Sequence, residues 1–250
     1  MELQYRGAMV GGIICQMFFG LILVAIYRAL YAGNPQSMPI TQITSYVWLQ
    51  QAFFRMLLSS DPDLMDKIKT GGIAYDLCRP LDLYGFYYVR ILALKLTGSL
   101  MRGIPMIIFA LLLPKGWGLE LPASPAGLGW GLLTLVVGLL CVTALENIAM
   151  AFAMRTIDSR GIYAMFNMLL CIFSGNILPL TLFPDSWQGV IRLLPYAQVF
   201  DGPIRLYTGA VDAAEAPMII LVQVLWTAAL IGIGIGLWRW NRKVIAIQGG

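Results

Sequence analysis

Acidic side chains that could support catalysis are concentrated in one polar stretch, residues 61–80, which reads DPDLMDKIKTGGIAYDLCRP. Asp61, Asp63 and Asp66 would suit a metal-assisted transferase, since carboxylates are the ligands that Mg²⁺ prefers. Pro62 and the lack of a second acidic cluster argue against this interpretation. The chain has no histidine, which excludes a histidine nucleophile relay, an HExxH zinc site and a histidine haem ligand. The sequence therefore predicts no catalytic residue and no metal site.

The chain also lacks a GxxxxGK[ST] phosphate-binding loop. If ATP drives this protein, another subunit must bind and hydrolyse it.

The composition is that of an integral membrane protein. Hydrophobic residues make up 59% of the chain and charged residues 12%, and the mean hydropathy is +0.76. Backbone groups in hydrocarbon must be hydrogen-bonded internally, so the long continuous apolar blocks predict helices. The four cysteines are scattered without a CxxC pair and are interpreted as packing residues.

Six apolar segments are long enough to cross a hydrocarbon core of about 30 Å. The predicted fold is an all-α membrane protein with one transmembrane domain over residues 1–250, whose spans lie near 8–27, 40–58, 91–113, 128–153, 162–183 and 218–238.

The distribution of Lys and Arg predicts the orientation, because cytoplasmic loops carry an excess of both. With both termini inside, only Arg28, Lys115, Arg192 and Arg205 of the 17 basic residues lie outside. The net charge of +4 is then a topology signal, and no basic stripe indicates nucleic-acid binding.

The polar stretch predicts a short cytoplasmic surface helix. Asp63 and Asp66 favour its N-terminal end, Lys67 and Lys69 suit its C-terminal end, and two glycines follow. Two interpretations are open at this point. The element anchors a loop in the lipid headgroups, or it is a rigid knob presented to a cytoplasmic partner.

The chain resembles the membrane subunits of ABC-2 type exporters, a six-span (type V exporter-like) permease group. The resemblance is carried by Tyr5-Arg6 before the first span and by the segments IKTGGI (68–73), DLCRPL (76–81) and 183–209, and it extends over nearly the whole chain. Members typically have an amphipathic helix before the first span, whereas only seven residues precede it here.

The resemblance implies a coupling helix between spans two and three that docks on an ATPase subunit. The implied contact residues are Asp63, Leu64, Met65, Asp66, Lys67, Ile68, Lys69 and Thr70, with Arg79 nearby. ATP and Mg²⁺ would be bound by that ATPase and not by this chain. The other implied partners are membrane lipid and a second permease subunit, either a homologue or another copy of this chain. The implied location is the bacterial inner membrane, and the implied process is export.

Residues 183–209, between the last two spans, are too interrupted by proline to cross the membrane. Trp187, Val190, Ile191 and Leu194 recur at helical spacing, which favours an amphipathic interfacial helix. The resemblance implies a re-entrant pair of helices here, and a plain interfacial loop is the alternative.

Two stripes of polar residues follow helical spacing in the spans. Thr44, Trp48, Gln51 and Arg55 share one face of the second span, and Tyr163, Asn167 and Ser174 share one face of the fifth. Such groups avoid lipid, so they line a translocation path or make hydrogen bonds between helices.

Two charged residues lie inside predicted spans, Arg102 in the third and Glu146 in the fourth. Because consecutive spans run antiparallel, both are expected at similar depth, and an isolated charge there costs at least about 2.5 kcal/mol. We therefore expect an intramembrane ion pair between them.

Three functional hypotheses follow. The leading one is the permease subunit of an ATP-driven transporter, which is not itself an enzyme. The alternatives are a membrane-embedded transferase and a passive channel or scaffold.

Overall fold

The computed structural model describes residues 6–33, 38–58, 62–70, 72, 75–76, 82–156 and 160–248. Within these ranges the regular elements are all helical. The α-helices are α1 (Arg6–Gly33), α2 (Ile40–Ala52), α3 (Pro62–Lys69), α5 (Leu83–Leu112), α6 (Pro125–Ala153), α7 (Arg160–Phe173), α8 (Asp185–Leu193), α9 (Ala197–Thr208) and α10 (Ala216–Gln248). Short 3₁₀ turns lie at Phe54–Met56, Leu180–Leu182 and Ala213–Glu215.

Among the described residues, four helices are long and apolar enough to cross a membrane, as predicted for spans one, three, four and six. The qualifying segments are Met9–Gly33, Leu83–Leu112, Pro125–Ala153 and Ala213–Asn241. Two of these helices start where the sequence provides caps. Asp82 Oδ2 accepts a hydrogen bond from the Gly85 amide at 2.9 Å before α5, and Ser124 Oγ accepts one from the Gly127 amide at 2.9 Å before α6.

The second and fifth predicted spans are shorter than expected. α2 has 13 residues and α7 has 14, so each is roughly 20 Å long at 1.5 Å per residue. The apolar stretch 162–183 is interrupted because Gly175 adopts a φ of +81°, a left-handed conformation that ends the helical run. The side-chain amide of Gln50 on α2 donates to the Gly175 carbonyl, so this turn packs against α2.

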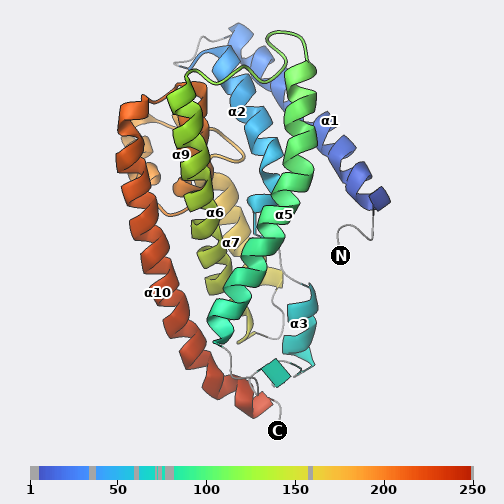
Figure 1. Cartoon of the computed structure of the whole chain (residues 1–250), viewed down its shortest axis with the longest axis vertical. Helices are drawn as coiled ribbons and strands as arrows, with labels where there is room; N and C mark the ends of the chain where they lie inside the picture. Colours follow the sequence, from blue (N-terminus) through green and yellow to red (C-terminus); the bar gives the residue numbers. More distant parts are fainter. Residues whose placement is uncertain are drawn as a thin grey trace.

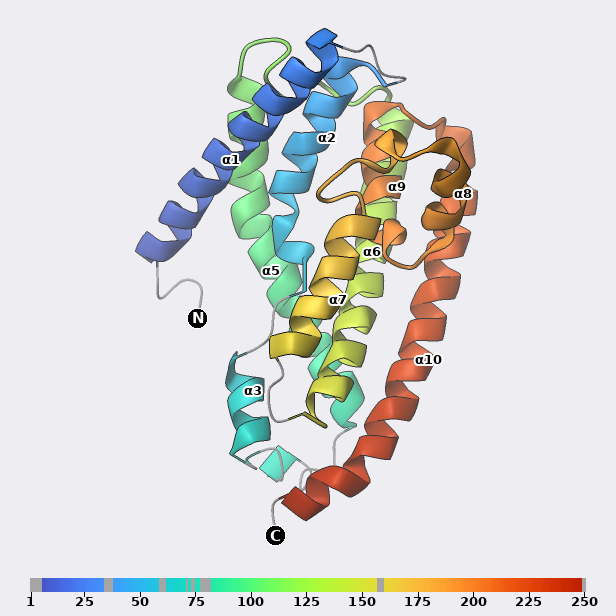
Figure 2. The ribbon, with the colours of Figure 1, turned by 180° about the vertical axis from the view of Figure 1, so that it is seen from behind.

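The helices form an elongated bundle with α6 at its centre, in contact with α5, α7, α9 and α10 (Figure 1). α1 packs on α2 and α5, and its N-terminal end stands away from the bundle (Figure 2). α3 and the C-terminal part of α10 lie at one end of the molecule, and the starts of α2, α6 and α10 lie at the other.

Close approach between α6 and α9 depends on glycine. A Cβ added at Gly138 would lie 2.9 Å from the Val199 carbonyl oxygen, and one at Gly127 would lie 2.6 Å from that of Leu206. Side chains there would force the two helices apart.

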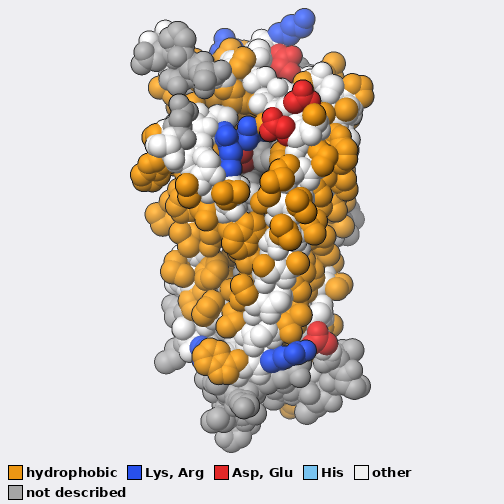
Figure 3. All heavy atoms as spheres, turned by 90° about the vertical axis from the view of Figure 1, so that its left-hand side faces the viewer, with side chains coloured by type: hydrophobic (Ala, Val, Ile, Leu, Met, Phe, Trp, Pro, Cys, Tyr) orange, Lys and Arg blue, Asp and Glu red, His pale blue; other side chains and the backbone are white. Residues whose placement is uncertain are grey.

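Hydrophobic side chains cover most of the middle of the face in Figure 3, and charged side chains gather toward its two ends. This distribution is the one expected for a helical bundle surrounded by lipid.

Candidate functional site

The predicted surface helix exists as α3. Asp63 lies in its first turn, where a negative charge is favourable, and Thr70 closes its end. The Thr70 amide and hydroxyl both donate to the Asp66 carbonyl, each at 2.8 Å. Positions 59–61 before the helix and position 71 after it lie outside the described residues.

α3 is fixed to the bundle at its first turn. Leu64 is fully buried in the main hydrophobic core. Beside it, Asp63 Oδ2 lies 2.8 Å from Arg90 Nη2 on α5. Because the Asp63 side chain is 43% exposed and that of Arg90 28%, this ion pair orients the helix and contributes at most about 1 kcal/mol.

A second attachment runs through Asp76. Its Oδ2 lies 3.2 Å from Lys67 Nζ and accepts a hydrogen bond from the Tyr87 hydroxyl at 2.7 Å. The Tyr87 ring stacks on Trp238 of α10 at 5.4 Å between centroids, and Trp238 Nε1 donates to the Asn147 carbonyl on α6. α3 is thereby connected to α5, α10 and α6.

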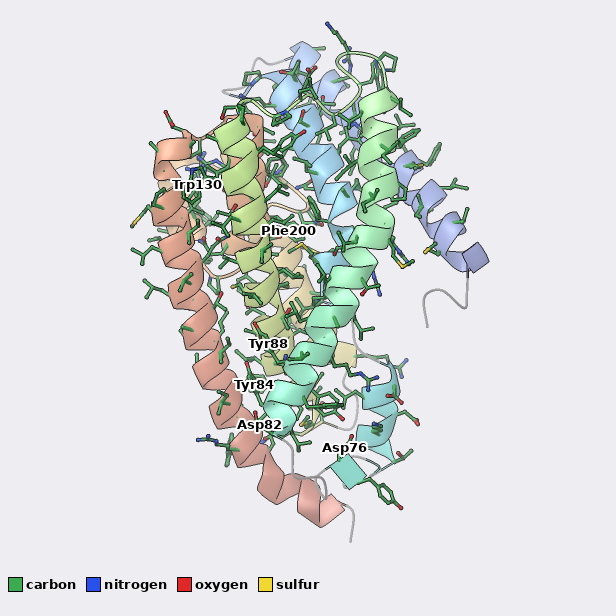
Figure 4. The ribbon with its side chains drawn as sticks, viewed as in Figure 1. Asp76, Asp82, Tyr84, Tyr88, Trp130 and Phe200 are labelled. Carbon is green, nitrogen blue, oxygen red and sulfur yellow. The ribbon has the colours of Figure 1, made fainter. Side chains whose placement is uncertain are left out.

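Figure 4 shows where this attachment lies in the bundle. Asp76 lies at the end that carries α3, the end at which Asp82 and the first turns of α5, with Tyr84 and Tyr88, also lie.

Some of the residues predicted to contact an ATPase attach α3 to the bundle instead, and others are exposed at the surface. Asp63, Leu64 and Lys67 hold α3 to the bundle, whereas Asp66 and Thr70 are exposed. The remaining predicted contacts have side chains outside the described part of the chain: Met65, Ile68, Lys69 and Arg79.

The intramembrane ion pair of Glu146 is with Lys95 and not with Arg102, which corrects the expected pairing. Lys95 Nζ lies 2.6 Å from Glu146 Oε2, and the two side chains are 3% and 2% exposed. Lys95 also donates to the carbonyls of Met56 and Leu57, at 3.1 and 2.8 Å. Three segments therefore meet at one ammonium group: the end of the α2 region, α5 and α6.

Arg102 lies about two helical turns further along α5 and is directed toward α1. A Cβ added at Gly12 would lie 3.6 Å from its Nη1 atom. The charge distribution alone places Lys95 near the cytoplasmic surface. Lys95 and Arg102 are seven residues apart and therefore on the same side of one helix. This spacing is the one feature of the sequence that indicates Lys95 as an alternative partner for Glu146.

The polar stripe of α2 is largely involved in packing within this subunit. Thr44 Oγ1 donates to the Ile40 carbonyl at 2.8 Å, and Trp48 Nε1 donates to the Trp117 carbonyl at 2.7 Å. The Gln51 carbonyl accepts from the Gln16 side chain on α1. Arg55 is half-buried in the 3₁₀ turn that follows α2.

The stripe of α7 also faces protein. Tyr163 and Ser174 are buried and Asn167 is half-buried. Asn167 Oδ1 and Ser174 Oγ are buried without a hydrogen-bond partner in the described part of the chain.

A charged cluster that the sequence analysis missed lies at the end opposite α3. Asp201 on α9 is 2% exposed, and its carboxylate is 3.4 Å from Arg205 Nη1 and 3.9 Å from Arg192 Nε. The Tyr46 hydroxyl donates to it at 3.3 Å. The signal available in the sequence was the i, i+4 spacing of Asp201 and Arg205.

The predicted interfacial segment folds as the helix pair α8 and α9. On α8, Ile191 is buried, whereas Trp187 and Val190, which were predicted on the same apolar face, are exposed at the surface of the subunit. Trp226 of α10 donates to the Leu193 carbonyl at 2.6 Å and fixes the end of α8.

Comparison with known proteins gives one family. The family described as ABC-2 family transporter protein matches residues 12–245. No curated protein and no solved structure matches the chain. The family match covers nearly the whole chain and agrees with four helices long enough to cross a membrane. The chain therefore belongs to the ABC-2 family of membrane transporter proteins.

Proposed function

We propose that this chain is the permease subunit of an ATP-driven exporter and that α3 is its coupling helix. An ATPase subunit would bind ATP and Mg²⁺ and dock on α3 from the cytoplasm. The membrane domain would have six spans, with α2 and α7 as the two shorter ones, and would pair with a second permease subunit.

The observation that supports this proposal is the way α3 is held. Its buried Leu64 and its two ion pairs join it to the bundle, while Asp66 and Thr70 are exposed. A loop that only anchors in lipid headgroups needs no such rigid connection to several helices. A helix that transmits a partner's movement does.

The Lys95 contacts provide a route for that movement. The segment leading from α2 to α3 is bonded through the carbonyls of Met56 and Leu57 to Lys95, and Lys95 is paired with Glu146 of α6. Displacement of α3 would therefore act on α2, α5 and α6 together.

Asn167 of α7 and Ser174, which directly follows that helix, are the best-placed candidates for a translocation path. Their side-chain oxygens are buried and lack partners within the described part of the subunit, so they would be available to bond to water or substrate if the packing around α7 opens during transport. The α2 stripe supports such a path less well, because Thr44 and Trp48 bond within the subunit.

Co-purification tests the proposal. The protein is extracted from native membranes in mild detergent, and the eluate is assayed for ATP hydrolysis and for a subunit that carries a phosphate-binding loop. We expect wild type to retain that subunit and Asp66→Arg to lose it. Glu215→Arg is the matched control, because Glu215 is an exposed acid that directly precedes α10, and α10 starts at the opposite end. Equal retention by both variants would count against docking at α3.

A further inference from the structure

An apolar cavity opens between four helices at the end of the bundle opposite α3. It has a volume of about 280 Å³. Its lining includes Leu49 of α2, Ile107 of α5, Leu128 and Leu132 of α6, and Ile204 of α9. Leu132 is 54% exposed, so the cavity reaches the hydrophobic outer surface of the bundle.

A polar cavity of about 270 Å³ adjoins it. Its lining includes four residues with polar side chains: Thr41, Gln42, Ser45 and the exposed Glu120. Among the lining residues that the structure describes, the one with a charged side chain is Glu120, and it is acidic.

The two cavities share Leu121 and Tyr207 as lining residues. Hydrogen bonds fix this border. Tyr207 donates to the Glu120 carbonyl at 3.0 Å, and the Glu120 amide donates to Ser45 Oγ at 3.0 Å. The loop between α5 and α6 is thus held between α2 and α9, and the combined site is preformed.

We propose that these cavities bind one aminophospholipid from the surrounding membrane. A hydrocarbon chain would occupy the apolar cavity, and the ammonium group of the head would face Glu120. The combined volume falls in the range of about 300–1,000 Å³ that is usual for ligand pockets. The single acidic group favours an ammonium head over an anionic one. This site is separate from α3 and does not depend on the proposed ATPase contact.

Lipid retention tests the proposal. The protein is reconstituted in nanodiscs with equal amounts of phosphatidylethanolamine and phosphatidylglycerol, released into detergent and analysed by native mass spectrometry. We expect wild type to retain about five times as much phosphatidylethanolamine as phosphatidylglycerol. One exposed ion pair, worth about 1 kcal/mol, supplies a factor of this size. Glu120→Gln should abolish this preference, and Glu215→Gln should leave it unchanged.

A second, independent test fills the apolar cavity with a larger side chain. Leu132→Trp should reduce retention of both lipids. Leu133→Trp should not, because Leu133 is an exposed neighbour on α6 that does not line the cavity. Equal retention of the two lipids by wild type would indicate adventitious annular lipid only and overturn the proposal. Lipid bound to monomers but absent from dimers would assign the groove to a subunit contact and also overturn it.

Discussion

Lys95 Nζ on α5 lies 2.6 Å from Glu146 Oε2 on α6, with both side chains almost fully buried. The pair also holds the end of the α2 region, because Lys95 donates to the carbonyls of Met56 and Leu57. The two charges compensate each other in a place where either alone would be costly.

Breaking this pair from one side should destabilise the protein strongly. Lys95→Met or Glu146→Gln should each lower the free energy of unfolding, Lys95→Met by about 3–5 kcal/mol because it removes the ammonium group that lies against a buried carboxylate. The double variant should lose less free energy of unfolding than the sum of the losses of the two single variants. Unfolding in detergent, analysed as a double-mutant cycle, measures the coupling. Additive losses would show that the pair is not energetically linked.

The attachment of α3 through Asp76 should depend on the Tyr87 hydroxyl. Tyr87→Phe removes the hydrogen bond to Asp76, worth about 1 kcal/mol, and should speed amide hydrogen exchange in α3. Tyr31→Phe is the matched control, since the Tyr31 hydroxyl has no hydrogen-bond partner in the described part of the chain. Unchanged exchange in α3 after Tyr87→Phe would show that the hydrogen bond between Tyr87 and Asp76 does not hold α3 in place.

The contact between α6 and α9 should tolerate no side chain at Gly138. A Cβ there meets backbone oxygens of α9 at 2.9 and 3.0 Å, so Gly138→Ala should cost about 1–3 kcal/mol. Gly129→Ala on the same helix meets nothing within 4 Å and should be neutral or stabilising by up to about 1 kcal/mol. Thermal unfolding distinguishes the two, and equal effects would contradict the packing.

The predicted orientation places α3 inside the cell and Glu215 outside. In a cysteine-free background, Glu215→Cys should react with a membrane-impermeant thiol reagent on intact cells. Asp66→Cys should react only after the membrane is permeabilised. The reverse pattern would invert the topology.

Hydropathy predicted the four long helices well, because a continuous apolar segment of this length in lipid must satisfy its own backbone hydrogen bonds and therefore forms a helix. It failed for the ends of α2 and α7. The turn at Gly175 depends on the left-handed backbone conformation of this residue and on its hydrogen bond with Gln50. Hydropathy carries no information about either.

The candidate site was predictable where its signals were local. The caps and charges of residues 62–69 predicted α3 directly. The partner of Glu146 was not predictable from depth alone, because Lys95 and Arg102 lie on the same helix and only packing decides which of them turns toward α6. The cluster around Asp201 likewise depends on contacts between α2, α8 and α9.

Site-specific photo-crosslinking tests the central claim, docking of an ATPase on α3, most directly. A photoreactive amino acid replaces Asp66 in one variant and Glu215 in another, and both are irradiated in native membranes. We expect a crosslink from position 66 to an ATP-hydrolysing subunit and none from position 215. An assembled, ATP-hydrolysing complex that shows no crosslink from position 66 would contradict this claim.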